Sequence, residues 1–189
     1  QAGDRLGALS SLLQMTERWN RPADRENLLW RIVGRFPGQR WALHELERGY
    51  GTAGNTGGLN KVYEALFALN PNDAGLKNNL AATSLLLKLN QTRACGQARE
   101  LYETANTNAV FVSTYAFALH VQGKSAEGLK LMQALPEADL QRPEIATYYA
   151  LLLSATGSRD QAGAYFIAAE KAQLLPEERQ LLAQARGQN

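Results

Sequence analysis

The stretch "LNPNDAGLKNNLA", residues 69–81, places a chain-breaking Asn-Pro-Asn-Asp directly in front of a segment with helical character. Pro71 has no backbone N–H and disfavours helical geometry at Asn70, so a helix that precedes it must end here. Asn72 and Asp73 carry short acceptor side chains that suit the start of the next helix. The stretch therefore predicts a tight turn between two helices.

The spacing of proline and glycine shows that such turns recur. The interval from Pro37 to Pro71 equals the interval from Gly123 to Gly157. Gly54 precedes Gly123 by two such intervals and one further position. Because glycine and proline interrupt regular structure at different kinds of turn, their agreement indicates a repeat of one fixed length.

Apolar residues between these turns recur every three or four positions, as Ala146, Tyr149 and Leu153 do, which is the spacing of one helix face. In the second half of four units a small or modest residue precedes a large one by four positions, as Ala162 precedes Phe166, whereas the first unit has Arg25 where the small residue belongs. The pattern predicts pairs of helices within a single domain over 1–189. The expected units are 6–39, 40–73, 74–108, 109–142 and 143–176, followed by a capping helix over 177–187.

These residues resemble the tetratricopeptide repeat, a family built from units of about 34 residues, which is the interval found here. The fifth unit carries most of the pattern: Ala146, Tyr149, Ala150, Leu153, Gly157, Ala162, Phe166, Ala169 and Pro176. The third unit departs from it, since "KLNQTRACGQ" has no glycine at the turn between its helices. The resemblance implies an all-α fold, a right-handed α-solenoid of about five helix-turn-helix repeats with a C-terminal capping helix.

In proteins of this family the first helix of each pair lines the concave side, which implies a groove for a peptide or protein segment. Asn78 and Asn79 can bond the backbone of an extended segment, Arg48 can meet a carboxylate, and Phe117 with Tyr148 can receive apolar side chains. The full set of candidate peptide-binding residues is His44, Arg48, Asn78, Asn79, Ser113, Phe117, His120 and Tyr148.

Structural roles compete with binding at several of these positions. Asn79 is common in the repeat without a ligand, and Phe117 can pack against a neighbouring helix instead of a partner. His44 and Arg48, four positions apart, fit a solvated helix face equally well. Tyr148 adjoins the core position Tyr149, so a shift of one position in register would exchange their roles.

The sequence shows no cluster of reactive groups, and we expect no catalytic residues, no metal and no cofactor. "HELER", residues 44–48, lacks the second histidine of a zinc-peptidase helix. The Gly-rich "GTAGNTGG" has neither the following Lys-Ser or Lys-Thr nor the preceding strand of a phosphate-binding loop. Cys95, the single cysteine, has no adjacent histidine and excludes an internal disulfide.

Charge and composition favour a protein or peptide partner. The 189 residues hold 20 Lys and Arg against 18 Asp and Glu without a basic block, which disfavours nucleic acid. No apolar run approaches the roughly 18 residues of a membrane span. The sequence starts at Gln1, so any signal or anchor is expected upstream, and no compartment is predicted.

We therefore interpret the chain as a non-catalytic protein-interaction scaffold. An RNA-binding helical repeat and a regulatory or anchoring module of a larger enzyme or envelope protein stay open as alternatives. Association of two copies through their terminal repeats stays open as well.

Overall fold

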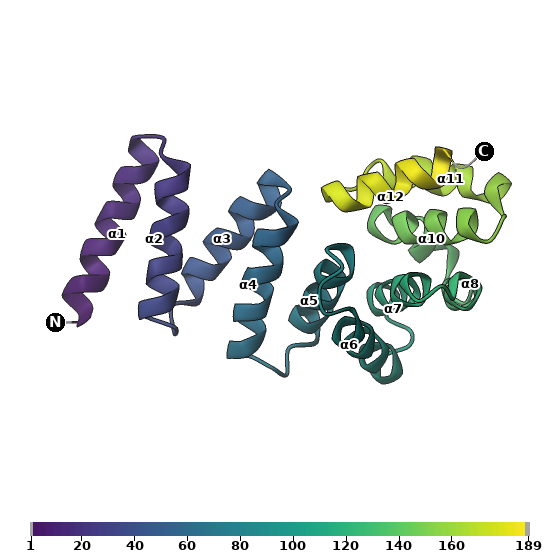
Figure 1. Ribbon diagram of the computed structural model, residues 1–189, viewed down its shortest axis with the longest axis horizontal. Helices are drawn as coiled ribbons and strands as arrows, with labels where there is room; N and C mark the ends of the chain where they lie inside the picture. The colour runs from purple at the N-terminus through teal and green to yellow at the C-terminus, as the bar shows by residue number, and fades with distance from the viewer. Residues whose placement is uncertain (1, 188–189) are drawn as a thin grey trace. The chain divides into compact units, whose positions relative to one another are not determined.

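The computed structural model describes residues 2–187, and within that range it contains helices and no strand (Figure 1). The predicted all-α fold of helical hairpins is confirmed. The chain divides into two compact units, Gln1–Leu69 and Asn70–Asn189, which we describe separately. The boundary between them lies in the Asn-Pro-Asn-Asp turn. The single domain over 1–189 and its division into five repeats stay predictions.

The first unit consists of two helical hairpins that pack against each other through α2 and α3. Its helices are α1 (Ala2–Arg18), α2 (Pro22–Arg35), α3 (Arg40–Ala53) and α4 (Thr56–Leu69). Gly54 ends α3 in the left-handed conformation with φ 62°, which glycine adopts without steric cost. Leu29, Ile32, Leu43 and Val62 are fully buried and form the core of this unit.

The second unit contains three further hairpins and a terminal helix, coloured teal to yellow in Figure 1. Its helices are α5 (Ala74–Leu86), α6 (Gln91–Thr104), α7 (Ala109–Val121), α8 (Ser125–Gln133), α9 (Glu137–Leu140), α10 (Pro143–Ala155), α11 (Arg159–Ala169) and α12 (Pro176–Gly187). We call α5, α7 and α10 the first helices of the hairpins. Each packs against the next, and the second helices α6 and α8 pack against the hairpin that follows.

The turn that opens the second unit is held by side-chain capping. The Asp73 carboxylate accepts a hydrogen bond from the backbone N–H of Leu76 at 3.0 Å, which satisfies one donor at the start of α5. Asn108 does the same for α7, where its side-chain oxygen accepts from the N–H of Val110 at 3.0 Å. Polar residues in these turns thus fix where the first helices begin.

Close approach of α8 to α7 requires a glycine. A Cβ atom on Gly128 would lie 2.7 Å from the backbone oxygen of Ala116 and 3.2 Å from Leu152 Cδ2. One turn later, Met132 is fully buried and fills the space beside this contact. The small residue followed by a large one, which the sequence shows in four of the five repeats, here lets two helix backbones meet.

The turn between α5 and α6 has no glycine and uses other residues in its place. Lys88 and Asn90 have positive φ angles of 57° and 42°. Asparagine tolerates this region well, whereas for lysine it costs about 1 kcal/mol. The hairpin of α5 and α6 therefore forms at a small conformational cost.

Candidate functional site

The terminal helix α12 packs against the first helix α10. It buries Leu182 and Ala185, and the Tyr148 hydroxyl of α10 donates a hydrogen bond to Glu178 Oε1 at 2.6 Å. Glu178 Oε2 also accepts from the backbone N–H of Leu175 at 2.8 Å, which caps the start of α12. The terminal helix is thus tied to the side of the unit on which the first helices lie.

A groove of about 480 Å³ separates α12 from α5 and α7, and we call it the inner groove. Leu85 and Phe117 line it from the first helices, and Leu181 lines it from α12. Gln180 and Gln184, which are exposed on α12, line it as well. The groove therefore combines apolar side chains with polar and charged ones, since Lys88 and Gln91 also line it and Glu177 lines it from α12.

An aromatic cluster adjoins the inner groove, which Phe117 and His120 line. The rings of Phe117 and Tyr148 have centroids 5.0 Å apart, and those of Phe117 and His120 are 6.3 Å apart. Phe117 is 3% exposed and Tyr148 is 9% exposed. Tyr149, the neighbour of Tyr148, faces the other way and meets Tyr165 of α11 edge to face at 4.6 Å. Three of the sequence candidates, Phe117, His120 and Tyr148, are thus brought together.

Burial controls the ionisation of this cluster. It lowers the pKa of His120, whose Nδ1 lies 3.0 Å from the Ser125 hydroxyl oxygen. Burial also raises the pKa of Tyr148 well above its ordinary value, and the negative charge of Glu178 adds to this effect. Both groups are therefore neutral at pH 7, which suits a site that holds apolar side chains.

The other candidates of the second unit are Asn78, Asn79 and Ser113. Asn78 is buried, and its Oδ1 has no hydrogen-bond partner among the described residues. Ser113 is buried too, and its hydroxyl donates to the backbone oxygen of Val110 at 2.9 Å. Asn79 is half-buried on α5. Asn78 and Ser113 are thus covered in this structure, and their contact with a partner stays a prediction.

His44 and Arg48 belong to the first unit, so they form a separate set. His44 Nδ1 lies 3.1 Å from Glu47 Oε2, and Arg48 Nη2 lies 3.0 Å from Glu45 Oε1. Glu45 also accepts a hydrogen bond from Arg25 at 2.5 Å, and chiefly this bond lowers the pKa of the Glu45 carboxyl. Arg48 already has an acidic partner on its own helix.

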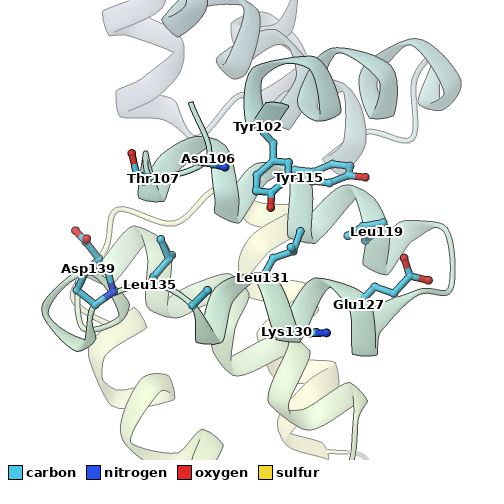
Figure 2. Close-up of a pocket in the computed structure, with 12 residues that line it drawn as sticks. Tyr102, Asn106, Thr107, Tyr115, Leu119, Glu127, Lys130, Leu131, Leu135 and Asp139 are labelled. Carbon is cyan, nitrogen blue, oxygen red and sulfur yellow. The ribbon is translucent and has the colours of Figure 1, made fainter. Parts of the chain in front are cut away.

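A second cavity, which the sequence did not predict, lies between α6, α7 and α8 and measures about 720 Å³ (Figure 2). Tyr102 and Tyr115 stack in it at 5.1 Å with an interplanar angle of 28°. It lies beside the end of α8, which has 9 residues where α6 has 14, and Pro136 disfavours continuation of the helix. We call this cavity the outer cleft, and Leu131 and Leu135 line it. Both residues are apolar although they lie outside the predicted core positions, and this was the signal in the sequence that pointed to the cleft.

Reactive groups are sparse in the part of the chain that is described. No group of three or more His, Cys, Asp or Glu side chains within residues 2–187 is arranged to hold a metal ion. The Cys95 thiol is buried and lies 3.9 Å from the backbone oxygen of Ala118. Within the same residues no helix combines the length and apolar character that crossing a bilayer requires.

Comparison with known proteins supports the fold. No protein-family model matches the chain, and no curated protein sequence matches it significantly. Among solved structures, the MamA RS-1 ArsTM double mutant is similar to it with a TM-score of 0.58 at 14% sequence identity, over 100% of each chain. At this identity the likeness concerns the fold alone, and it supports a helical repeat of the tetratricopeptide type.

Proposed function

We propose that the chain is a non-catalytic protein-interaction module and that the second unit binds a segment of a partner protein along its first helices. The observation that carries this proposal is the position of α12. The first helix α10 already holds a helix by apolar contacts of Leu182 and Ala185 and by one partly buried hydrogen bond from Tyr148. The same surface therefore has the chemistry that a docked segment requires.

The inner groove offers the combination of groups that is common in peptide recognition. Val121 and Leu181, both half-buried, supply accessible apolar surface, and Phe117 lies behind it at 3% exposure. Aromatic side chains often dominate the energetics of such contacts. His120 and Gln184 stand at the same groove and can exchange hydrogen bonds with a peptide backbone. Burying one large apolar side chain in such a site contributes roughly 1.5–3 kcal/mol. We expect Phe117 to contact the apolar anchor of the partner.

The proposal is tested with the full chain and a displayed library of random peptides. Peptides selected on the full chain should lose about tenfold or more in affinity when Gln184→Trp fills the groove, since an anchor side chain is then excluded. Gln161→Trp is the matched control, because Gln161 is an exposed glutamine on α11 that lines none of the cavities described here. Selected peptides that bind Gln184→Trp as tightly as the unaltered chain would refute the assignment to the inner groove.

A further inference from the structure

The terminal helix fills the space above the first helices incompletely. Two of its 12 residues, Leu182 and Ala185, are buried, while Leu181 is half-buried at the edge of the inner groove. A well-packed helix would leave no space of about 480 Å³ against α5 and α7. The helix α12 therefore fits this surface imperfectly. A helix that filled the groove more completely would bind the surface more tightly.

The contacts of α12 differ between the start and the end of the helix, so they define a direction. Glu178 near the start accepts from the buried Tyr148 hydroxyl, and Leu182 and Ala185 follow on the same face. Arg186 at the end pairs with Glu170 at 2.7 Å and lies 4.7 Å above the Phe166 ring. The acid and the arginine are eight positions apart, which is about 12 Å along a helix.

We propose that α12 is a built-in competitor for the surface formed by the first helices, and that the partner segment is an amphipathic helix of the same pattern that binds by displacing it. This inference rests on the proposed function and specifies its partner class. The partner helix carries a carboxylate in its first turn, a leucine four positions later and an arginine eight positions later.

The buried hydroxyl of Tyr148 explains why the carboxylate is required. A hydroxyl that loses its acceptor in a buried site bears the full cost of desolvation, so a displacing helix without an acid there would bind poorly. Arg186 sets the orientation, because a reversed helix would bring its arginine to the Tyr148 end and its acid next to Glu170. The site thus selects both the sequence and the direction of the helix.

The first measurement uses a fluorescent peptide with the sequence of residues 174–187 and the full chain. Leu182→Asp in the protein should release α12, and the peptide should then bind about 10- to 100-fold more tightly, because the surface is no longer occupied most of the time. Hydrogen exchange of the α12 amides, compared with those of α7 and α10, reports the release directly. Should Leu182→Asp unfold the unit, the exposed Arg186→Ala weakens α12 docking alone, and Arg99→Ala on α6 is its matched control.

The second measurement tests recognition of the carboxylate. A peptide with Glu178→Gln should bind the Leu182→Asp chain several-fold more weakly than the unaltered peptide, and Tyr148→Phe in the protein should reduce this preference to the part that capping by Glu178 contributes. Tyr165→Phe is the control in the protein, because its hydroxyl donates to Glu137 on α9 at 3.0 Å and does not contact α12. An unchanged preference in the Tyr148→Phe chain would overturn the proposed partner pattern.

Failure of this inference and failure of the proposed function give different results. A chain whose α12 is released but which binds the peptide no more tightly overturns the displacement model, while library peptides blocked by Gln184→Trp still support an inner-groove site. Library peptides that ignore Gln184→Trp and also bind the α12-released chain no more tightly overturn the proposed function itself, because they use neither the inner groove nor the surface under α12. Light scattering would detect a dimer in which two full chains exchange their α12 helices. Such a dimer would assign the surface to a second copy of the chain and overturn the proposal of a separate partner.

Discussion

Gly128→Ala gives a direct test of the close contact between α7 and α8. The added Cβ would lie 2.7 Å from the Ala116 backbone oxygen, and such contacts do not fall below 3.0 Å in proteins, so the two helices must separate by a few tenths of an ångström. Overpacking of this kind costs about 1–3 kcal/mol, and alanine offsets roughly 0.5–1 kcal/mol of it through its higher helix propensity. We expect a net loss of about 1–2 kcal/mol in the free energy of unfolding of the second unit.

Gly163→Ala is the matched control for this substitution. A Cβ atom on Gly163 meets no atom within 4 Å, so alanine should stabilise α11 by about 0.5–1 kcal/mol. Urea unfolding is followed by circular dichroism, which reports both units, and by tryptophan fluorescence, which reports the first unit because Trp19, Trp30 and Trp41 all lie there. Gly128→Ala should shift the dichroism transition and leave the fluorescence transition in place. If Gly128→Ala stabilised the chain as Gly163→Ala does, the close-contact argument would be wrong.

Three further predictions concern capping and ionisation. Asp73→Ala should cost the second unit about 1 kcal/mol because the N–H of Leu76 loses its acceptor, whereas Asp73→Ser should retain most of the stability in urea unfolding. The pKa of Glu45 is lowered by its hydrogen bond to Arg25, so the stability of the first unit should be fully present above pH 4.5 and fall as the pH drops through the lowered value. Tryptophan fluorescence should show this fall in the unaltered chain and less of it in Glu45→Gln. Burial lowers the pKa of His120 below 6.5, so the unfolded chain takes up the proton first and the stability of the second unit should decrease as the pH falls below 6.5. Dichroism melts at several pH values should show this decrease, and a melt of His120→Gln that depends on pH to the same extent would contradict it.

The helical fold was predictable because the residues that end its helices act on the local backbone. Proline and asparagine at residues 70–73, and glycine in the left-handed conformation at Gly123 and Gly157, act through backbone geometry that the sequence specifies directly. The helices α3, α5, α7 and α10 begin at Arg40, Ala74, Ala109 and Pro143, the residues at which the repeat period starts each unit. The second half of the fourth sequence repeat, residues 109–142, is divided into α8 and α9. This division was not predicted, although Pro136 lies between the two helices.

The candidate site was less predictable because it depends on contacts between distant segments. Helical periodicity places Phe117 and Tyr148 on faces of their helices, but it does not indicate which element covers those faces. The sequence also predicts a capping helix with Leu181 and Leu182 docked, and the structure buries Leu182 against the first helices while Leu181 borders the inner groove. Which helix α12 packs against is decided by tertiary packing, which a local spacing of three or four positions does not specify. Whether the candidate residues bind a partner stays a prediction.

The late position of α12 in the chain has a consequence for synthesis on the ribosome. The last first helix ends at Ala155, whereas α12 ends only at Gly187. At about 5–20 residues per second, the ribosome needs roughly 2–6 seconds to produce this interval. Until α12 has emerged and docked, Tyr148 lacks its Glu178 partner and the face of α10 is uncovered, so the nascent chain presents this surface to chaperones before its own terminal helix can compete for it.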